Sequence, residues 1–416
     1  MVAELISVGT ELLLGNIVNT NAAFLSREMA ALGVSVYYQS TVGDNEDRLI
    51  NAVKLALDRS DIVILTGGLG PTKDDLTKES VAKALERQLV LDEQSQQAIK
   101  EYFEKRKKTE VPENNWKQAM VIEGAKVLAN HNGTAPGMIV EVDEKAVILL
   151  PGPPKEMIPM VKESVVPYLK SQSEQVFYSA MVKIAGMGES AVAMKIEDLI
   201  DGQTNPTIAP YAKIGEVHLR VTASASTTKE AKELVKPVVK ELKKRFGTKI
   251  YTTNEEETLE EVVVKLLQKH ELTLVTAESC TAGLLTGRIV NVAGVSEVLK
   301  EGFITYTNKA KRKLLDVSKS TLKKYTAVSE QTAKEMVKGA AIGGDADVAV
   351  SVTGLAGPGG GTDEIPVGTV YIGCYANEKV KVRHFIFNGN REKIRELSVV
   401  SALDLLRTWI MENYEK

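Results

Sequence analysis

A stretch rich in hydroxyl and thiol groups carries the residue types that nucleophilic catalysis needs. Ser279, Cys280 and Thr281 follow a short apolar run at 272–275, which predicts a buried strand, and a helix is expected at 284–290. The first N–H groups of a helix lack intrahelical acceptors and favour negative charge. Ser279 could therefore attack an acyl carbon while nearby amides receive the developing oxyanion.

A serine nucleophile needs a base, and Lys311 is our candidate because it follows the expected strand 303–307. A lysine acts as a base only where burial or neighbouring cations lower its pKa towards neutrality. The alternative interpretation is that Ser279 caps the helix and that Lys311 is solvated. From local sequence alone, this alternative is favoured.

Two further segments are expected near the same turn. A glycine-rich loop at 353–362 follows a buried-type strand at 347–352. Arg391 and Arg395 open the last helix, where their spacing puts them on one face. Two such guanidinium groups could grip a phosphate. The last part of the chain thus offers a hydroxyl-rich turn, a lysine, a glycine-rich loop and a cationic helix start.

A second loop with chemical potential follows the apolar strand 62–65 near the N-terminus. It carries glycines, a lysine and two carboxylates: Gly67, Gly68, Gly70, Lys73, Asp74 and Asp75. In open α/β sheets, ligands bind beyond the carboxyl ends of the strands, where Asp44 of the neighbouring strand is also expected. Glycines let backbone amides approach a phosphate, and carboxylates suit Mg²⁺ or Mn²⁺. The alternative is a glycine turn with an aspartate cap.

Other strand ends could reach the same pocket. Gly9 and Glu11 follow the first strand, and the loop 133–137 is rich in small residues. The rigid Pro-Gly-Pro-Pro turn at 151–154 places Glu156 in the first turn of a helix. Glu156 could face this pocket or simply interact favourably with the helix dipole.

The order of elements predicts three α/β or α+β domains, at 1–170, 171–252 and 253–416. In the first, strands alternate with helices, which predicts a doubly wound sheet. In the second, the run 216–222 alternates as a strand with one wet face, and a lysine-rich helix at 228–245 carries interleaved glutamates. The third is expected to be another α/β domain.

Composition excludes several classes of function. The net charge of −3 over 416 residues gives no general argument for nucleic acid, and no apolar run is long enough to span a membrane. Two cysteines provide no disulfide framework or zinc spacing, and none of the four histidines sits in a catalytic motif. Without a signal peptide, a cytoplasmic location is expected.

The N-terminal motifs resemble those of the CinA family of competence/damage-inducible proteins. They are Gly-Thr-Glu-Leu-Leu-Leu-Gly at 9–15, Val-Gly-Asp-Asn at 42–45, Thr-Gly-Gly-Leu-Gly-Pro-Thr at 66–72, Gly-Thr-Ala-Pro-Gly at 133–137 and Leu-Pro-Gly-Pro-Pro at 150–154. The resemblance implies a molybdopterin-binding-like domain, a metal-dependent ADP-ribose pyrophosphatase activity with Mg²⁺, Mn²⁺ or Co²⁺, and a KH-like middle domain. It places Asp44 and Asp75 at the metal and implies that the substrate contacts are Gly9, Glu11, Gly67, Gly68, Gly70, Lys73, Asp74 and Glu156.

The C-terminal motifs resemble the CinA domain that also occurs alone as nicotinamide mononucleotide (NMN) deamidase. They are Ala-Glu-Ser-Cys-Thr at 277–281, Thr-Tyr-Thr-Asn at 305–308, Ala-Val-Ser-Glu at 327–330, Thr-Gly-Leu-Ala-Gly-Pro at 353–358, Pro-Val-Gly-Thr-Val at 366–370 and Gly-Asn-Arg at 389–391. The resemblance implies Ser279 as nucleophile, Lys311 as base and Tyr306 as an orienting residue, without a cofactor. The implied substrate contacts are Glu278, Cys280, Thr281, Gly283, Thr353, Gly354, Ala356, Gly357, Arg391 and Arg395.

Some residues depart from the family pattern, and two alternatives stay open. Ala282 stands where the family usually has glycine, Lys309 where glutamate is common, and Asn390 where aspartate precedes the arginine. One alternative is an amidase based on Cys280, since a thiol at a helix start is activated. The other is a non-catalytic nucleotide-binding regulator of competence or DNA repair. The family expectation is a homodimer. The middle domain lacks the Gly-x-x-Gly loop of nucleic-acid KH domains, so nucleic-acid binding is not expected.

Overall fold

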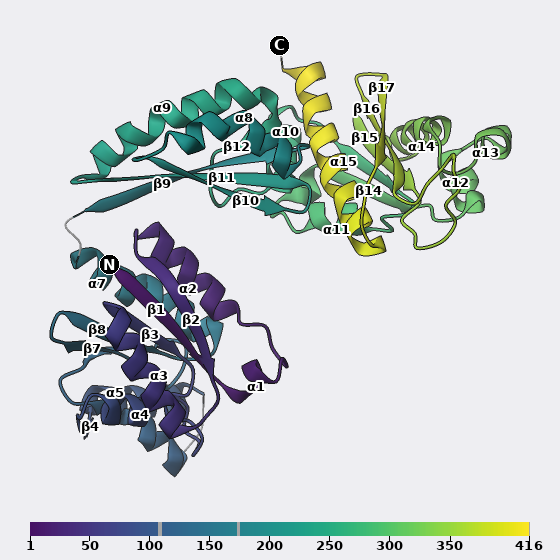
Figure 1. The fold of residues 1–416 in the computed structure, drawn as a ribbon. Helices are drawn as coiled ribbons and strands as arrows, with labels where there is room; N and C mark the ends of the chain where they lie inside the picture. Colours follow the sequence, from purple (N-terminus) through teal and green to yellow (C-terminus); the bar gives the residue numbers. More distant parts are fainter. Residues whose placement is uncertain (107–109, 173–174, 416) are drawn as a thin grey trace. The chain divides into compact units, whose positions relative to one another are not determined.

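The computed structural model describes residues 1–106, 110–172 and 175–415. The chain forms two compact units, Met1–Tyr178 with Ser224–Ala231, and Ser179–Ala223 with Lys232–Lys416. We describe the sheets of each unit separately (Figure 1). The division into three domains at the predicted boundaries stays a prediction.

A six-stranded sheet with the order β2-β1-β3-β8-β7-β6 forms the N-terminal unit. Strands β2, β1, β3 and β8 are parallel, and β7 and β6 continue the sheet antiparallel. The elements are β1 (Val2–Val8), α1 (Thr10–Leu13), α2 (Thr20–Ala31), β2 (Ser35–Val42), α3 (Glu46–Arg59), β3 (Ile62–Thr66), α4 (Thr77–Ala84), β4 (Leu89–Leu91), α5 (Glu93–Lys105), η1 (Glu113–Ala119), β5 (Met120–Ile122), β6 (Lys126–Leu128), β7 (Gly137–Val142), β8 (Lys145–Leu150), α6 (Pro154–Met160), η2 (Val161–Val165) and α7 (Val166–Ser171).

Both faces of this sheet are covered, as a doubly wound fold requires. In β3, Ile64 packs into the core that includes residues of α2, α6 and α7, whereas Val63 and Leu65 pack into the opposite core with α3 and α4. Because side chains alternate across a strand, a strand buried on both faces is apolar throughout. The apolar run that predicted β3 is therefore explained by this double burial.

A five-stranded sheet with the order β14-β13-β15-β16-β17 carries the C-terminal part of the second unit. Strands β14, β13 and β15 are parallel, and β16 and β17 are antiparallel to their neighbours. The elements are α10 (Leu259–Lys269), β13 (Leu274–Glu278), α11 (Leu284–Val290), η4 (Val295–Glu297), β14 (Leu299–Ile304), α12 (Asn308–Leu315), α13 (Lys319–Tyr325), α14 (Glu330–Gly343), β15 (Val348–Gly354), β16 (Thr369–Ala376), β17 (Lys379–Ile386) and α15 (Arg391–Tyr414).

The two faces of this second sheet are also both buried. Residues of α10, α11 and α15 share one core with Leu274, and residues of α14 share the opposite core with Val275. Several predicted strands were displaced by two to four residues, since β13 extends to Glu278 and β14 ends at Ile304. The predictions followed apolar runs, whereas β13 buries the polar side chains of Thr276 and Glu278 with hydrogen-bond partners.

A four-stranded sheet with the order β10-β11-β9-β12 forms the middle of the chain. Its elements are β9 (Val176–Ala185), α8 (Glu189–Asp201), β10 (Thr207–Lys213), β11 (Glu216–Ala225), α9 (Thr228–Phe246), η3 (Gly247–Lys249) and β12 (Ile250–Thr252). The prediction that β11 has one wet face was wrong, because Glu216, His218 and Arg220 are buried. Partners distant in the sequence, among them Tyr251, Glu255 and Arg288, form hydrogen bonds with these polar groups.

Candidate functional site

Ser279 directly follows the carboxyl end of β13, which lies between β14 and β15 in the five-stranded sheet. Its backbone N–H donates to the carbonyl of Val352 at 2.9 Å, which extends the pairing of β13 with β15 by one residue. The chain then turns through 280–283 before α11 begins at Leu284. The residue is buried, with 8% of its surface exposed.

Lys311 reaches Ser279 from the neighbouring strand end. After β14, Thr307 caps α12 by accepting a hydrogen bond from the N–H of Ala310, and Lys311 lies in the first turn of that helix. Its Nζ lies 2.8 Å from Oγ of Ser279 and donates to the carbonyl of Thr305 at 2.7 Å. The side chain is fully buried, and burial lowers the pKa of Lys311 to about 8. The lowered pKa that a lysine needs to act as a base is therefore present at Lys311.

The capping interpretation of Ser279 is not supported by this geometry. The N-cap of α11 is Gly283, in a left-handed conformation with φ 92°. Because glycine has no side chain, the N-cap residue cannot accept a hydrogen bond from the first N–H groups of the helix. Instead the carboxylate of Glu278 accepts from the N–H groups of Gly283 at 3.0 Å, Leu285 at 3.1 Å and Thr286 at 2.8 Å.

Glu278 is therefore a structural residue of the turn, which corrects its predicted role as a substrate contact. It is fully buried, and both of its carboxylate oxygens accept hydrogen bonds. The same geometry corrects the expectation that the first amides of the helix receive the oxyanion, because a carboxylate already occupies them. Gly283 lies in the same turn with its N–H group taken.

Cys280 lies next to the nucleophile but in an apolar environment. It is 5% exposed, and burial raises the pKa of its thiol to about 11 despite the nearby cations of Lys311 and Arg395. A thiol with this pKa is protonated at neutral pH and is a poor nucleophile. The structure thus disfavours the alternative in which Cys280 attacks the substrate.

Tyr306 and Arg391 form an exposed polar edge near the dyad. Arg391 donates from Nη1 to the carbonyl of Gly357 at 2.8 Å and from Nη2 to the hydroxyl of Tyr306 at 3.5 Å. Tyr306 is 59% exposed. Its hydroxyl pairs with Arg391, whereas the carbonyl of Thr305 holds Lys311. Tyr306 was expected to orient either Lys311 or the substrate; a contact with the lysine is not seen, and orientation of the substrate stays a prediction.

Arg395 occupies a different position from the one predicted. Its guanidinium donates to the carbonyls of Cys280 at 3.0 Å and Thr281 at 2.9 Å. Arg391 and Arg395 therefore do not form a free phosphate fork, because Arg395 is committed to the backbone of the nucleophile turn. Thr281 itself is fully buried.

Most of the predicted residues of the glycine-rich loop are buried in the fold, and one of them contacts the exposed edge of the site. Thr353 is buried and donates to the carbonyl of Ala327 at 2.6 Å, and Ala356 is buried in the core. At Gly354 an added Cβ would lie 2.8 Å from the carbonyl of Thr369. Of this predicted set, Gly357 contacts the exposed edge through Arg391.

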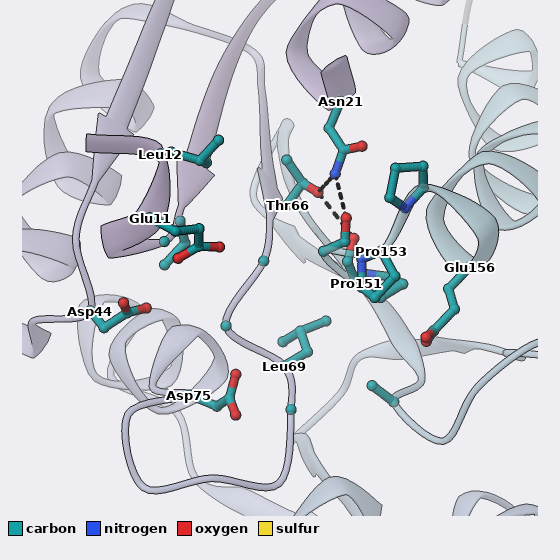
Figure 2. Close-up of a pocket in the computed structure, with 18 of the residues that line it drawn as sticks. Glu11, Leu12, Asn21, Asp44, Thr66, Leu69, Asp75, Pro151, Pro153 and Glu156 are labelled. Atoms are coloured by element: carbon teal, nitrogen blue, oxygen red, sulfur yellow. Dashed lines mark hydrogen bonds between the residues drawn. The ribbon is translucent and has the colours of Figure 1, made fainter. Parts of the chain in front are cut away.

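A separate cavity of about 720 Å³ lies at the strand ends of the N-terminal sheet. Figure 2 shows the carboxylates of Glu11, Asp44 and Asp75 around this space. Of the predicted residues, those that line the cavity are Gly9, Glu11, Asp44, Gly67, Gly68, Gly70, Asp74, Asp75 and Glu156. Lys73 is exposed and does not line it. The cation that contacts this loop is Lys117, which donates to the carbonyl of Thr72 at 3.1 Å.

Asp44 and Asp75 are held in the same way. Oδ2 of Asp44 accepts from the N–H of Thr10 at 3.0 Å and from its hydroxyl at 2.7 Å. Oδ2 of Asp75 accepts from the N–H and the hydroxyl of Thr72. In the described part of the chain, neither Oδ1 has a hydrogen-bond donor. A Cβ on Gly70 would clash with the Asp75 carboxylate, so a glycine at position 70 leaves room for that carboxylate.

This donor set fits a hard divalent cation that keeps water and substrate ligands. Within residues 1–106, 110–172 and 175–415, no three His, Cys, Asp or Glu side chains converge as a ready metal cage. Mg²⁺ typically takes one or two carboxylates together with substrate phosphates and waters. The free Oδ1 atoms of Asp44 and Asp75 match that requirement. Asp44 follows β2 rather than a strand next to β3, since β1 lies between the two, but both aspartates line the same cavity.

Several site residues were missed by sequence reasoning. Asn21 lines the cavity and donates to Oγ1 of Thr66 at 3.0 Å and to the carbonyl of Gly152 at 2.7 Å, as the dashed lines in Figure 2 show. Glu156 accepts from Asn130 at 2.7 Å. Neither Asn21 nor Asn130 lies in a quoted motif, and Thr305 was expected inside the strand 303–307. Thr305 lies just beyond β14, so its position past a strand end was the signal that could have identified it.

The fold and the site together define an α/β protein that places a buried serine–lysine pair on one sheet and an acidic cavity on another. Family profiles match three successive segments: "Probable molybdopterin binding domain" at 4–171, "Damage-inducible protein CinA KH domain" at 179–252 and "CinA C-terminal domain" at 256–410. The chain belongs to the CinA family.

Full-length relatives support this assignment. A putative competence-damage inducible protein of Clostridium beijerinckii is 52% identical over 407 residues, 98% of this chain and 99% of the relative. A CinA-like protein of Kosmotoga olearia is 53% identical over 407 residues, 98% of either chain. A crystal structure of CinA from Thermoplasma acidophilum, described as of unknown function, is 38% identical and covers 40% of this chain and 97% of its own, with a TM-score of 0.37.

The fold class agrees with this membership. The N-terminal domain is molybdopterin-binding-like, the middle domain is KH-like, and the C-terminal part is a CinA domain. Among the described helices, none combines the length and the apolar character that a membrane crossing would need.

Proposed function

We propose that the C-terminal domain is an amidohydrolase that converts NMN to nicotinic acid mononucleotide and ammonia. The observation that carries this proposal is the 2.8 Å contact between Nζ of Lys311 and Oγ of Ser279. Burial lowers the pKa of Lys311 to about 8, so a sizeable fraction of the lysine is neutral near physiological pH. A neutral amine beside a serine hydroxyl is the arrangement that activates the nucleophile.

The chemistry follows from the two side chains. Neutral Lys311 takes the proton of Ser279 while Oγ forms a bond to the carboxamide carbon. The C–N bond then breaks, and the ammonium of Lys311 returns a proton to the leaving nitrogen, which departs as ammonia. A water next gives a proton to Lys311 and attacks the acyl-serine. Breakdown of that second intermediate returns the proton to Ser279 and releases the carboxylate product.

The exposed edge of the site suits a nucleotide substrate. Among the described residues, Arg391 donates to the backbone carbonyl of Gly357 and makes a long contact with Tyr306, which leaves donors for a phosphate. Tyr306 is exposed beside it and offers a face for a ring. The resemblance of the motifs to NMN deamidases selects NMN among such substrates.

The test is release of ammonia from NMN by the purified full chain. Wild type is expected to turn over, and Ser279→Ala and Lys311→Ala are expected to lose turnover by a factor on the order of 10⁴ or more. Absence of turnover by a folded wild-type chain would overturn the proposal. Tight binding of NMN without hydrolysis would instead support the non-catalytic regulator.

We further propose that the acidic cavity of the N-terminal domain cleaves ADP-ribose to AMP and ribose 5-phosphate with a divalent cation. Asp44 and Asp75 would hold the cation through their free oxygens, and the glycine loop at 67–70 would receive the diphosphate. When bound, such a cation neutralises phosphate charge and lowers the pKa of a coordinated water.

The test is AMP release after removal of metal and after addition of Mg²⁺, Mn²⁺ or Co²⁺ singly. We expect no AMP from the metal-free chain, restoration by at least one cation, and loss in Asp75→Asn. AMP release that is unaffected by metal removal would contradict the proposal. Ser279→Ala serves as a control, because its substitution lies in the other compact unit and leaves Asp44 and Asp75 untouched.

A further inference from the structure

Arg395 grips the backbone of the nucleophile turn with two of its donors. It lies one turn into α15, four residues after Arg391. Its Nε donates to the carbonyl of Cys280 and its Nη2 to the carbonyl of Thr281, at 3.0 Å and 2.9 Å. These are two consecutive carbonyls immediately after Ser279. A guanidinium offers its donors in a rigid planar fork, so it fixes the orientation of both peptide groups at once.

Because the peptide bond is planar, the contacts of Arg395 with the two carbonyls also determine where the N–H groups of Thr281 and Ala282 point. In a trans peptide unit, the C=O and the following N–H point in opposite directions. With the carbonyls of Cys280 and Thr281 turned to Arg395, the N–H groups of Thr281 and Ala282 point away from it. In the part of the chain that the structure describes, these two N–H groups have no acceptor.

Three neighbouring amides of the turn are already bound. The N–H of Ser279 is bound to Val352, and those of Gly283 and Leu285 are bound to Glu278. Ala282 and Gly283 also both take the left-handed conformation, with φ values of 50° and 92°. This left-handed conformation at 282 explains why glycine is usual there in the family.

We propose that the N–H groups of Thr281 and Ala282 form the oxyanion hole and that Arg395 is the positioning residue that aims them. The inference rests on the proposed acyl transfer at Ser279. Preorganised donors that need no movement at the moment of reaction are a major source of rate enhancement. The positive charge on the carbonyl side also polarises each peptide group and strengthens its N–H as a donor.

Substitution of Arg395 should therefore lower kcat more than it raises KM. Loss of one oxyanion donor costs about 10²–10³-fold in kcat, and Arg395→Gln is expected to fall in this range, with KM for NMN changed by less than about threefold. Arg391→Met should show the opposite pattern, a raised KM with kcat largely kept. Arg383→Met is the matched control, because Arg383 is an exposed arginine of β17 outside the site.

A second assay separates this inference from the identity of the substrate. p-Nitrophenyl acetate acylates an active serine without needing a nucleotide, and the released p-nitrophenol measures the rate. We expect Arg395→Gln to slow this acylation by about 10²-fold and Arg383→Met to leave it unchanged. If wild type is acylated at Ser279 but does not hydrolyse NMN, the proposed substrate fails while the oxyanion assignment is still tested.

Two outcomes would overturn the inference. One is an Arg395→Gln chain that is acylated at the wild-type rate, and the other is a raised KM with normal kcat, which would make Arg395 a phosphate ligand. Folding is checked by thermal unfolding of every variant. If Arg395→Gln is unstable, Arg395→Ala is assayed with and without guanidinium ions at low millimolar concentration. Rescue of kcat by guanidinium supports positioning, and absence of rescue in a folded variant contradicts it.

Discussion

The ammonium nitrogen of Lys311 lies 2.8 Å from the hydroxyl of Ser279 and 2.7 Å from the carbonyl of Thr305. Across the residues that the structure describes, no carboxylate forms an ion pair with Lys311. A buried cation without a counter-charge is destabilised, and this is why the pKa of Lys311 is lowered to about 8. The same contact therefore both presents a base to the nucleophile and keeps that base partly neutral.

The first prediction concerns the pH dependence of turnover. Because the neutral form of Lys311 is the active one, kcat/KM for NMN should rise with pH, with an inflection near the pKa of about 8, and then level off. Lys311→Arg should be inactive at every pH, because arginine stays protonated. A profile that is flat or falls between about pH 7 and 9 would exclude Lys311 as the base.

The second prediction is that Lys311→Met stabilises the fold while it abolishes turnover. The lowered pKa means that the folded state binds a proton less well than the unfolded chain does, so protonation of Lys311 opposes folding. The gain should be on the order of 2–3 kcal/mol at most, because the contacts to Ser279 and Thr305 are also lost. It should be full below about pH 8 and fade as pH rises towards 10.5, the ordinary lysine value. Urea unfolding at several pH values checks this, and a destabilised variant at neutral pH would contradict it.

The third prediction separates Ser279 from Cys280. Cys280→Ala removes a buried thiol whose pKa is raised to about 11, so kcat should fall by less than about tenfold and stability by about 1–2 kcal/mol. Ser279→Ala should abolish turnover with little change in stability. Mass spectrometry after p-nitrophenyl acetate should place the acetyl group on Ser279 in the Cys280→Ala chain. Acetylation that vanishes in Cys280→Ala would restore the thiol as nucleophile.

The sequence predicted which strand ends meet but not which way the long polar side chains turn. Ser279 and Lys311 follow β13 and β14, which are adjacent and parallel, so the placement rule for α/β sheets brings them together. Glu278 and Arg395 carry the same kinds of charge as substrate contacts. They bind free backbone groups of the turn instead. Which backbone groups of the turn need a side-chain partner depends on the conformation of the turn, and the sequence does not show that conformation.

In the middle sheet, too, the sequence pattern did not predict where polar side chains lie. The alternation in β11 predicted a solvent-facing side, because Glu216, His218 and Arg220 are polar. Their burial depends on Tyr251, Glu255 and Arg288, which lie tens of residues away in the chain. A pattern of one strand cannot identify partners that only the fold brings near.

The fourth prediction concerns Glu278 as the residue that holds the nucleophile turn. Glu278→Gln replaces one accepting oxygen by an NH₂ group that faces backbone N–H donors, so the free energy of unfolding should fall by about 2–4 kcal/mol. kcat should fall as well, because Gly283 and Leu285 lose their acceptor and the turn loosens. Chemical unfolding and NMN kinetics measure both effects. Glu301→Gln, an exposed glutamate of β14, is the control and should be neutral; a stable, fully active Glu278→Gln would refute this role.

The last prediction uses the matched threonine contacts of Asp44 and Asp75. Each carboxylate has one oxygen held by a threonine and one oxygen free, so the two residues offer two ligands, too few for tight binding of a cation alone. We therefore expect Mn²⁺ to bind weakly to the chain by itself and at least about tenfold more tightly with AMP, whose phosphate completes the coordination. By linkage, Mn²⁺ should tighten AMP by the same factor. Titration calorimetry in both directions gives the two factors.

Variants decide whether the orientation or the charge of Asp75 is responsible for Mn²⁺ binding. Thr72→Val keeps the charge of Asp75 and the N–H donor to its Oδ2 but removes the hydroxyl donor, and it should weaken Mn²⁺ binding about 10-fold, the usual effect of losing a partner that orients a metal ligand. Asp75→Asn should weaken it further. Ser95→Ala in α5 is the control, because Ser95 is not among the residues that line the cavity. Equal Mn²⁺ affinity in wild type and Asp75→Asn would place the cation elsewhere, and it would remove the acidic cavity as the site of a metal-dependent hydrolysis.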